Sequence, residues 1–218
     1  MLTEKIFNQI ANIYDRTNDI ISLGTHKFVK KIAVSKLNIS KSCFILDICT
    51  GTGDIVQIIK KIRPNAKVIG MDISENMLKI AKQKDPTGVY IKNDCQQLPF
   101  KDNEFDIVTA SFGIRNIEDR TKVLSEIYRV LKPGGKFLHL DFGYKNIFSY
   151  IFDLIVLSSI KIFKIPTNNY KYLIDSKNEF PNPDKLVIEF EKFGFVKENV
   201  HNFLLGVISC QIMKKLKK

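Results

Sequence analysis

The segment from Asp47 to Asp54, Asp-Ile-Cys-Thr-Gly-Thr-Gly-Asp, contains the residues with the clearest chemical signal in the chain. Gly51 and Gly53, separated by one residue, allow a tight turn and let a ligand approach the backbone without meeting a side chain. The segment follows a short apolar run and precedes a helical pattern, so it joins a strand to a helix. Because ligands of open parallel sheets bind at the carboxyl ends of strands, we expect this loop to border a ligand site.

Polar residues follow three further apolar runs, at the positions where strands should end. Asp72 lies about 20 residues beyond Gly53, the separation at which a carboxylate accepts hydrogen bonds from a ribose. Asp94 is placed to accept from an adenine amino group, the amide of Cys95 to meet a ring nitrogen, and Ser111 to border the same cleft. This ordered series at consecutive strand ends predicts a ligand that contains adenosine.

The phosphate-binding fingerprints do not match this loop. The dinucleotide fingerprint requires a glycine three residues after Gly53, where this chain has Val56, and this disfavours NAD and FAD. A P-loop is excluded because no Gly-Lys-Ser/Thr follows the glycines. S-adenosyl-L-methionine contains adenosine but no pyrophosphate, and its charged aminoacyl group can use the loop amides and a nearby carboxylate. We therefore expect S-adenosyl-L-methionine as the cofactor.

Short apolar runs alternate with helical patterns from Ser42 to Phe142, which is typical of strand-helix units around a parallel sheet. Ser74 is a predicted helix N-cap, and Lys132-Pro133-Gly134-Gly135 is predicted to end a helix with a turn. Five strands in series predict a doubly wound α/β fold. The expected strands are Phe44–Ile48, Lys67–Met71, Val89–Lys92, Phe105–Ser111 and Lys136–Phe142, and the expected helices are Ile55–Ile62, Glu75–Lys82 and Arg120–Leu131.

The length of 218 residues favours a single domain with three parts. Residues 1–41 are expected to form a helical cap, with joints at Tyr14, Asp15, Asn18, Asp19 and Gly24, and residues 42–142 the cofactor-binding core. Residues 143–218 are expected to hold the substrate-side helices and the final strands. This last part should comprise an apolar segment Ile147–Ile165, a polar loop Pro166–Pro183, a helix Lys185–Phe193, two strands ending near Met213 and a solvated lysine tail.

Composition limits the partners and the compartment. The net charge of +11 favours an anionic partner such as nucleic acid, phosphate groups or an acidic lipid surface. The four cysteines form no C-x-x-C pair, so we expect reduced, packed thiols and no metal site. The start of the chain lacks a secretory signal pattern, which favours a reducing compartment. Asp153, Lys161 and Lys164 interrupt the apolar segment, so we expect no transmembrane helix.

Further motifs extend over nearly the whole chain in a fixed order. They are Phe7–Ala11 with Tyr14–Asp15 and Asn18–Asp19, Ser22–Gly24, Leu46–Asp47 with Gly51–Asp54, Asp72–Leu78, Leu98–Phe100, Phe112–Asn116, Arg129–Gly135, and Tyr172–Leu173 with Ser176. In these motifs the chain resembles the quinone-biosynthesis C-methyltransferases of the ubiquinone and menaquinone pathways, which are class I S-adenosylmethionine-dependent enzymes. Phe-Gly-Ile-Arg-Asn together with the N-terminal Tyr-Asp and Asn-Asp pairs is the most restrictive part of the match.

The resemblance implies a Rossmann-like class I methyltransferase fold, with a mostly parallel seven-stranded sheet flanked by helices. It also implies methyl transfer to a ring carbon of a polyprenylated quinol. We expect demethylmenaquinol, with a methoxy-polyprenylbenzoquinol or a phytyl naphthoquinol as alternatives. The cofactor contacts of the family map onto Thr52, Asp72, Asp94, Cys95 and Ser111. The chain departs from the family pattern in having Phe28 or Val29 for a tryptophan, Asp141 for a glutamate, and Gln211 near a usual histidine.

Methylation of a ring carbon requires an electron-rich ring, which deprotonation of a quinol hydroxyl provides. Arg115 is the expected stabiliser of the oxyanion, because a guanidinium stays charged and donates in a fixed fork, and Asn116 is expected to orient the ring oxygen. Tyr14 is an expected contact or proton relay. The structural alternatives are an ion pair of Arg115 with Glu118 or Asp119, and a Tyr14 that only covers the core.

The identity of the base stays open at this point. A water held by a carboxylate is one solution, and Asp15, Asp19 and Asp141 are equal candidates for that carboxylate. His26 and His139 have only their residue type to recommend them.

A quinol with an isoprenoid tail lies in a membrane, so the enzyme needs an apolar entrance. The stretch Ile147–Phe163 is expected either to roof the acceptor pocket and touch lipid or to form a buried core helix. The lysine tail would add attraction to an anionic leaflet. We expect a protein of the cytoplasm, or of an organelle matrix or stroma, with peripheral membrane contact; a homodimer is a further expectation.

Two other functions remain as alternatives. The positive charge is compatible with a nucleic-acid methyltransferase, but Ser111-Phe112-Gly113 stands where exocyclic-amine methyltransferases have Asn/Asp-Pro-Pro-aromatic, and the chain has no Pro-Cys pair. We therefore expect no nucleic-acid partner. A non-catalytic S-adenosylmethionine-binding protein is the third alternative, and the Arg115-Asn116 and Tyr14-Asp15 pairs argue against it.

Overall fold

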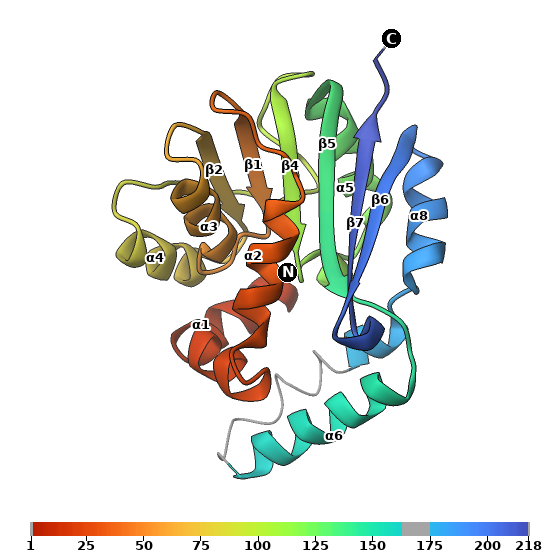
Figure 1. The fold of residues 1–218 in the computed structure, drawn as a ribbon. Helices are drawn as coiled ribbons and strands as arrows, with labels where there is room; N and C mark the ends of the chain where they lie inside the picture. The colour runs from red at the N-terminus through yellow and green to blue at the C-terminus, as the bar shows by residue number, and fades with distance from the viewer. Residues whose placement is uncertain (1, 163–174, 218) are drawn as a thin grey trace.

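Seven strands form the central sheet of the computed structural model, which describes residues 2–162 and 175–217 (Figure 1). The sheet order is β3-β2-β1-β4-β5-β7-β6, and β7 runs antiparallel to β5 and β6 while the other pairs are parallel. Strand order reverses between β1 and β4, which makes their carboxyl ends the expected position for a ligand. The predicted mostly parallel seven-stranded sheet is confirmed. The strands are β1 Phe44–Ile48, β2 Lys67–Asp72, β3 Val89–Lys92, β4 Phe105–Ser111, β5 Leu131–Phe142, β6 Phe195–Phe203 and β7 Ile208–Lys215.

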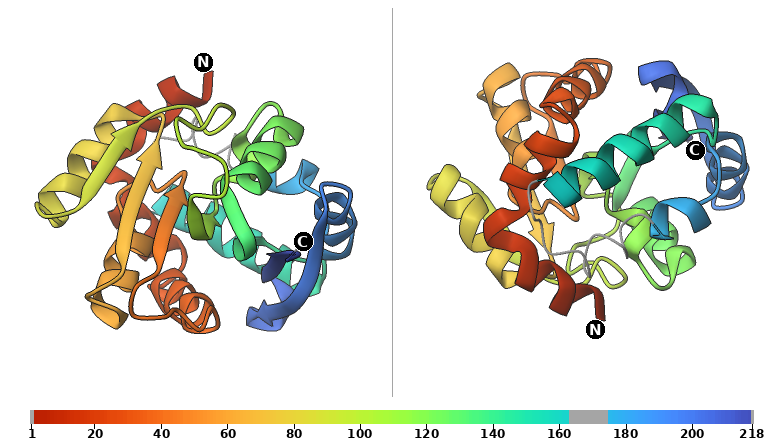
Figure 2. Two further views of the ribbon diagram at one scale, coloured as in Figure 1. Left: turned by 90° about the horizontal axis from the view of Figure 1, so that it is seen from above. Right: turned by 90° about the horizontal axis from the view of Figure 1, so that it is seen from below.

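Helices cover both faces of the sheet, as the alternation of apolar side chains along buried strands requires (Figure 2). On β1, Ile45 packs towards α2 (Thr25–Ser35) and α3 (Asp54–Ile62). Leu46 and Ile48 point the other way and pack towards α5 (Arg120–Val130) and α8 (Pro183–Glu191). The predicted bounds of β1 to β4 agree with the structure to within one residue, because each of these strands is a compact apolar run.

The N-terminal cap contains one joint between its two helices. α1 runs from Leu2 to Ile21 without interruption, and α2 begins at Thr25. The predicted joints at Tyr14, Asp15, Asn18 and Asp19 are therefore wrong, because these residues lie inside α1. Gly24, with φ +73°, does lie at the joint, where its missing side chain permits the left-handed conformation.

The cap is fastened to the sheet layer through α4 (Glu75–Lys84). Ser74 is the N-cap of α4, as predicted, and accepts a hydrogen bond from the amide of Met77 at 3.2 Å. Asn8 of α1 reaches this cap, because its Oδ1 accepts from Ser74 Oγ at 2.8 Å and from the amide of Asn76 at 3.1 Å. The start of α4 therefore sets the position of α1 over the ends of the strands.

Two predictions about the C-terminal half are wrong. The Lys132–Gly135 segment lies inside β5, which begins at Leu131 directly after α5. The pairing of β5 with β4 shifts at this segment and Gly134 has φ +81°, so it is an irregular part of the strand and not a separate turn. Lys214 and Lys215 belong to β7 and not to a solvated tail; Lys215 Nζ donates to the carbonyls of Tyr128 and Leu131.

α6 (Ile147–Ile162) crosses the molecule beyond the carboxyl ends of the parallel strands (Figures 1 and 2). It corresponds to most of the predicted apolar segment; Tyr172–Leu173 and the first part of the polar loop lie outside the described residues. The C-terminus lies at the opposite end of the molecule from α6 (Figure 1). The expectation that the lysine tail and α6 serve one surface is therefore wrong. Within residues 2–162 and 175–217, no helix has the length and apolarity needed to cross a bilayer.

Candidate active site

A first cavity lies where the strand order reverses, and we call it the strand-end cavity. Five of the predicted cofactor residues line it: Gly51, Asp72, Asp94, Cys95 and Ser111. Asp72 and Ser111 end β2 and β4, and the others lie in the loops after β1 and β3, so parallel strands bring residues that are far apart in the sequence to one edge of the sheet. The remaining lining residues are Thr3, Phe7, Tyr14, Cys49, Met71, Ile73, Met77, Asn93, Gln96, Phe112, Gly113, Asn116 and Ile117.

Asp72 organises the glycine loop of this cavity. Its Oδ2 accepts from the amide of Gly51 at 2.8 Å, and its Oδ1 accepts from the amide of Ser74 at 2.9 Å. Burial raises the pKa of Asp72, and these two amides partly oppose the rise. Gly51 has φ +55° and its Cα faces open space, so the backbone of the loop is accessible to a ligand.

Two non-glycine residues of the cavity wall have strained backbones. Cys49 has φ +53° and Phe112 has φ +55°, in the left-handed region that side chains disfavour. They are close together, because a Cβ placed on Gly113 would lie only 2.3 Å from Cys49 Cβ. The loops after β1 and β4 therefore pack against each other at the switch point, and only a glycine fits at position 113.

Unused polar atoms indicate what the strand-end cavity can bind. Ser111 Oγ and Asn116 Oδ1 are buried and have no hydrogen-bond partner among the described residues. Such atoms are costly unless a ligand or water satisfies them. Together with the carboxylates of Asp72 and Asp94, which accept from hydroxyl and amino groups, they suit the ribose and adenine of a nucleoside. The residues present therefore fit S-adenosyl-L-methionine.

The other two predicted cofactor residues, Thr52 and Gly53, are not in the lining of this cavity. Thr52 Oγ1 donates to Asp15 Oδ1 at 2.7 Å and accepts from Lys84 Nζ at 3.0 Å, and Lys84 also pairs with Asp15. A Cβ on Gly53 would lie 2.7 Å from the hydroxyl oxygen of Tyr90. Thr52 joins the loop to α1 and α4, Gly53 packs against Tyr90, and the neighbouring Gly51 lines the cavity.

A second cavity adjoins the first beneath α6, and we call it the apolar cavity. Tyr14 and Phe112 line both cavities, so these two side chains form the boundary between them. Phe142, Phe152, Val156 and other apolar side chains make up much of its wall. The full lining is Tyr14, Asn18, Ile21, Ser22, Thr25, His26, Lys30, Phe112, Arg115, Phe142, Phe152, Asp153, Val156, Lys177 and Ile208.

Arg115 enters the apolar cavity as half of a buried ion pair. Its Nη1 donates to Asp141 Oδ1 and to the carbonyl oxygen of Phe112, both at 2.8 Å, and the two charged side chains are 6% and 0% exposed. The alternative pairing with Glu118 or Asp119 is wrong. Arg115 Nε and Asp141 Oδ2 have no hydrogen-bond partner among the described residues, so the pair retains an unused donor and an unused acceptor.

The predicted catalytic residues are divided between the cavities. Arg115 lines the apolar cavity, Asn116 lines the strand-end cavity, and Tyr14 lines both. Tyr14 lies on α1 and packs edge-to-face with Phe7, with ring centroids 6.2 Å apart. The cap thus supplies one of the two side chains at the boundary.

None of the three candidate carboxylates for the base lines either cavity. Asp15 is held by Thr52 and Lys84, Asp19 by Lys27 at 2.6 Å, and Asp141 by Arg115. Each of them therefore forms an ion pair in the structure and lies outside the lining of both cavities.

Four polar residues of the apolar cavity have no place in the sequence-based assignment: His26, Lys30, Asp153 and Lys177. Lys177 Nζ donates to Asp153 Oδ1 at 2.5 Å and ties α6 to residues 175–179. The sequence did give a reason to expect a partner for Asp153, because a carboxylate within an apolar helix needs one. His26 lies next to the joint at Gly24. Because the helix breaks there, the sequence spacing does not reveal that His26 lies close to Ser22 and Asp19.

Lys30 connects the apolar cavity to the glycine loop. Its Nζ lies 2.9 Å from Asp54 Oδ2, and the two side chains are 11% and 20% exposed. Burial opposes the charge on Lys30, but Asp54 outweighs it and raises the pKa of the ammonium. Burial likewise opposes the charge on Asp54, but Lys30 and Lys84 lower its pKa overall. Both groups stay charged, and they hold α2 against the start of α3.

The sequence of the chain is similar to those of known proteins over nearly its whole length. The profile of the ubiE/COQ5 methyltransferase family matches residues 2–215. Proteins named demethylmenaquinone methyltransferase in Staphylococcus aureus strains JH9 and Newman are 35% identical over 223 residues, which covers 98% of this chain and 92% of theirs.

Solved structures share the fold. A S-adenosylmethionine-dependent methyltransferase of Thermotoga maritima, described as a possible histamine N-methyltransferase, has a TM-score of 0.74 at 21% identity and covers 99% of this chain and 100% of its own. A putative methyltransferase of Haloferax volcanii, in complex with the activator Trm112, has a TM-score of 0.75 at 16% identity, with coverage of 96% and 97%. Because the family profile matches residues 2–215 and relatives of 35% identity cover 98% of the chain, the chain belongs to the ubiE/COQ5 methyltransferase family.

Proposed function

We propose that this enzyme transfers a methyl group from S-adenosyl-L-methionine to a ring carbon of demethylmenaquinol. The observation that carries the proposal is the adjoining pair of cavities, one polar and lined by strand ends, the other apolar, with Tyr14 and Phe112 shared between them. A donor in the first and an aromatic acceptor in the second would meet at that boundary. The names of the relatives from Staphylococcus aureus support the choice of acceptor.

The residues of the strand-end cavity would hold the cofactor. Asp72 would accept from the ribose, Asp94 from the adenine amino group, and Ser111 and Asn116 offer polar atoms that are otherwise unused. When bound, S-adenosyl-L-methionine supplies an electrophilic methyl group on a sulfonium. The role of the loop of Gly51 is to bring backbone amides within reach of the carboxylate of its aminoacyl group.

Residues of the apolar cavity act on the acceptor. The guanidinium of Arg115 stabilises negative charge on a quinol oxygen, for which its Nε is the available donor. Tyr14 orients the ring from the boundary between the cavities, and Asn116 does so from the adjoining strand-end cavity. Phe112, Phe142 and Phe152 exclude water from the ring, which strengthens the interaction between Arg115 and the oxyanion.

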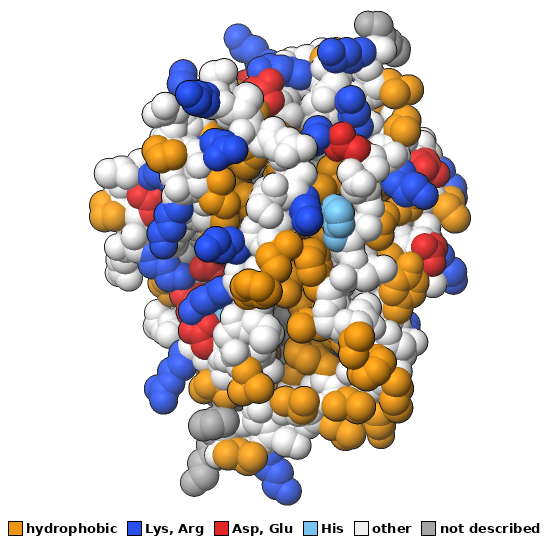
Figure 3. All heavy atoms as spheres, viewed as in Figure 1, with side chains coloured by type: hydrophobic (Ala, Val, Ile, Leu, Met, Phe, Trp, Pro, Cys, Tyr) orange, Lys and Arg blue, Asp and Glu red, His pale blue; other side chains and the backbone are white. Residues whose placement is uncertain are grey.

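The outer face of α6 is proposed as the surface that meets the lipid in which a long-tailed quinol dissolves. Figure 3 shows hydrophobic side chains gathered over the end of the molecule where α6 and the turn Leu204–Gly206 lie. Ile151, Leu154, Leu204 and Leu205 are 45%, 47%, 41% and 68% exposed. The opposite face of α6 lines the apolar cavity, so one helix would separate the lipid from the acceptor.

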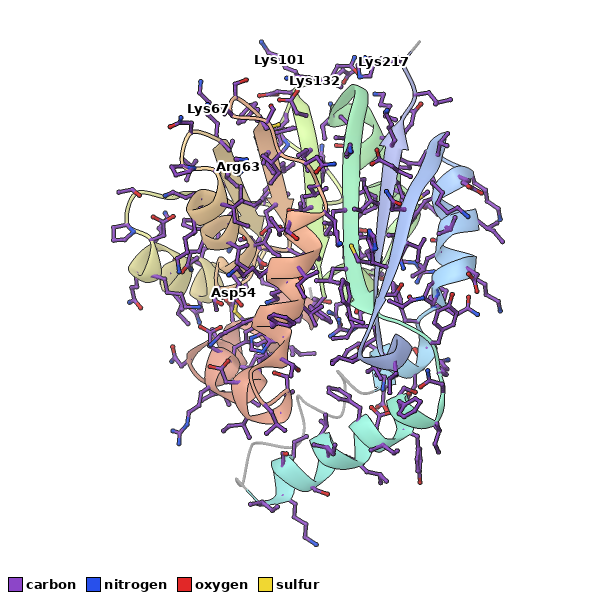
Figure 4. All side chains as sticks on the ribbon, viewed as in Figure 1. Asp54, Arg63, Lys67, Lys101, Lys132 and Lys217 are labelled. Atoms are coloured by element: carbon purple, nitrogen blue, oxygen red, sulfur yellow. The ribbon has the colours of Figure 1, made fainter. Side chains whose placement is uncertain are left out.

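A nucleic-acid substrate is the weaker candidate. Lys101, Lys132 and Lys217 lie at the end of the molecule opposite to α1 and α6, as Figure 4 shows. The cations of the apolar cavity are each paired with a carboxylate: Lys30 with Asp54, Arg115 with Asp141 and Lys177 with Asp153. Phosphates would therefore find no uncompensated charge at the acceptor site.

The test is methyl transfer by the purified chain from labelled S-adenosyl-L-methionine to demethylmenaquinol, with a methoxy-polyprenylbenzoquinol and a phytyl naphthoquinol as competing acceptors. Mass spectrometry should find one added methyl on the demethylmenaquinol ring. The same analysis of quinones after deletion of the gene should find a precursor lighter by one methyl. Methylation of transfer RNA, with no methylated quinol in either arm, would refute the proposal.

A further inference from the structure

His26 is a buried histidine in the wall of the apolar cavity that the assignments above leave unused. It lies in the first turn of α2, next to the joint with α1, and its side chain is 10% exposed. Tyr14 of α1 and Arg115 of the loop after β4 line the same cavity. A ring that binds there would therefore have an imidazole, a phenol and a guanidinium in its surroundings.

The hydrogen-bond network assigns the tautomer of His26. Ser22 Oγ lies 2.6 Å from the carbonyl oxygen of Asn18 and 2.7 Å from His26 Nδ1. The carbonyl can only accept, so the single hydroxyl proton of Ser22 is donated to it. Nδ1 must then carry a proton and donate to Ser22 Oγ, which leaves the lone pair of a neutral ring on Nε2.

Nε2 is available as a proton acceptor. Asp19 Oδ1 lies 3.7 Å from it, which is too long for a hydrogen bond, and no described residue hydrogen-bonds to Nε2. Burial and the neighbouring Lys30 lower the pKa of His26 to about 4, so the ring is neutral at physiological pH. Asp54 and Asp19 act in the opposite direction and would favour the imidazolium once it forms.

The charged groups in the lining are unsuitable as the base. Lys30 and Lys177 are paired ammonium groups, and Arg115 is a permanent cation. The carboxylate Asp153 is occupied by Lys177 at 2.5 Å. Among the carboxylate, ammonium, guanidinium and imidazole groups of the described residues that line this cavity, His26 therefore has the unengaged proton acceptor.

We propose that Nε2 of His26 is the general base that removes the hydroxyl proton of the quinol, with Ser22 fixing the tautomer and Asp19 facing the imidazolium. The inference rests on the proposed function, because it requires a phenolic acceptor in the apolar cavity. The hydroxyl proton passes to Nε2 as electron density moves to the ring carbon. That carbon forms its bond to the methyl group while the carbon-sulfur bond breaks with its electron pair on sulfur. The ring carbon then loses its own proton to water, and His26 returns its proton to the oxygen, so one proton is released per methyl group.

Substitution of His26 gives the first arm of the test. His26→Gln should lower kcat for demethylmenaquinol by about 10²–10⁴-fold, the usual contribution of a general base. The affinity for S-adenosylhomocysteine, measured by calorimetry, should change by less than about twofold, because His26 is outside the strand-end cavity. His201→Gln is the matched control, since His201 lies on β6 and lines neither cavity. In His26→Ala, added imidazole should restore part of kcat.

Nitrogen NMR of the histidine-labelled protein gives a readout that needs no turnover. The wild type at neutral pH should show a protonated Nδ1 and an unprotonated Nε2 for His26, assigned by comparison with His26→Gln. A tail-less naphthol added to the S-adenosylhomocysteine complex should shift the Nε2 resonance as the hydroxyl donates to it. In Ser22→Ala the two tautomers should mix, while the affinity for S-adenosylhomocysteine stays unchanged.

The outcomes separate this proposal from the proposed function. Methylation of a quinol by both wild type and His26→Gln at similar kcat would overturn the role of His26 and leave the function intact. A protonated Nε2, or an Nε2 resonance that ignores the bound naphthol, would also overturn it. If the wild type methylates no quinol, the proposed function fails by that result, and the NMR arm still decides whether His26 accepts a hydrogen bond from a phenol.

Discussion

Arg115 forms an ion pair with Asp141. The resemblance to the family drew attention to Asp141 only because the family has a glutamate at this position. Asp141 is fully buried beside Arg115, and Asp141 Oδ1 also accepts from the amide of Phe142 at 2.8 Å. Removing one member of such a pair leaves an uncompensated charge in a low-dielectric environment. A loss of activity in an Arg115 variant therefore has two causes, a lost oxyanion donor and a weakened fold, and the two must be separated.

We expect Arg115→Met to lower the free energy of unfolding by about 3–5 kcal/mol, because it leaves Asp141 buried without its cation. Arg115→Met combined with Asp141→Asn should regain most of that loss, since the asparagine keeps the acceptor for Phe142 and removes the charge. Methyl transfer should stay lost in both variants. Urea denaturation and turnover assays check this; a double variant as unstable as the single variant would contradict the ion-pair account.

The pH dependence of stability should report His26 independently of catalysis. Its pKa is about 4 in the folded chain and 6.5 in the unfolded reference, so in this window the unfolded chain binds the proton that the folded chain excludes. Stability from this group therefore falls as the pH is lowered from 6.5 towards 4. Urea midpoints of wild type should decrease more steeply through this window than those of His26→Gln.

The buried carboxyl group of Asp47 has the opposite effect on the pH dependence of stability. Burial raises its pKa to about 7, so the folded chain binds the extra proton and the contribution of Asp47 to stability decreases as the pH rises towards 7. This opposing contribution is common to wild type and His26→Gln and cancels in their difference. Lys27, Lys30, Asp19 and Asp54 face His26 and are also unchanged. Parallel profiles for the two proteins would mean that His26 binds its proton equally in the folded and unfolded chains, which would contradict the lowered pKa.

The sequence could predict the lining of the strand-end cavity better than that of the apolar cavity. Asp72 and Ser111 follow apolar residues directly, and Asp94 lies two residues after β3, so the geometry of a parallel sheet places all three at one edge. His26 and Lys177 reach the apolar cavity from a helix joint and from beyond α6. No local pattern encodes how α2 and α6 pack against the sheet, so the chemistry of these residues could not be derived from their spacing.

At the scale of the elements, the contact between the loops after β1 and β4 is a point of close packing. Gly113 has φ −110°, which any residue can adopt, so the requirement for glycine comes from the 2.3 Å approach to Cys49 Cβ alone. Gly113→Ala should therefore displace the loop after β1 and raise the dissociation constant of S-adenosylhomocysteine by about tenfold or more. A tenfold rise corresponds to a loss of about 1.4 kcal/mol of binding free energy.

Cys49→Gly should rescue Gly113→Ala. The change removes the Cβ that causes the clash, and it relieves the positive φ of Cys49, which costs a non-glycine residue about 1–2 kcal/mol. Calorimetry of the single and double variants measures the rescue. Equal affinity of Gly113→Ala and wild type, or a double variant no better than Gly113→Ala, would show that this contact does not set the shape of the cavity.

The accuracy of the predicted elements follows from their local signals. β1, β3 and β4 match their predicted bounds because each is one apolar run. The cap was mispredicted because Tyr14, Asp15, Asn18 and Asp19 resemble breaks, whereas tertiary contacts use them: Asp15 binds Thr52 and Tyr14 covers the cavity boundary. Polar residues inside α1 are explained by the loop and helices they contact, and a single sequence does not contain that information.

At the scale of the whole molecule, three labelled lysines lie far from the main exposed apolar surface. The labelled lysines Lys101, Lys132 and Lys217 lie at one end, and the exposed apolar side chains of α6 lie at the other, beside the apolar cavity (Figures 3 and 4). Attraction of the lysines to an anionic leaflet would turn α6 away from the membrane. An orientation that admits a lipid-dissolved quinol must therefore be driven by apolar contact.

This arrangement predicts that lipid binding depends on α6 and resists salt. The wild type should sediment with vesicles of phosphatidylcholine and phosphatidylglycerol, and raised salt should weaken binding little because few charges lie at the contact. Ile151→Glu with Leu154→Glu should reduce vesicle binding by about tenfold or more, since two half-exposed apolar side chains are lost from the interface. Lys101→Glu with Lys217→Glu is the control at the opposite end and should leave binding in place.

Turnover of the same variants distinguishes a lipid surface from a subunit interface. Ile151 and Leu154 line neither cavity, so the glutamate variant should methylate a tail-less quinol at the wild-type rate and lose activity on a long-tailed quinol held in vesicles. Light scattering should find the same mass for wild type and variant. A wild-type dimer that the α6 substitutions dissociate, or vesicle binding that only the lysine substitutions abolish, would contradict lipid contact through α6, because the apolar face would then be covered by a second copy or turned away from the bilayer.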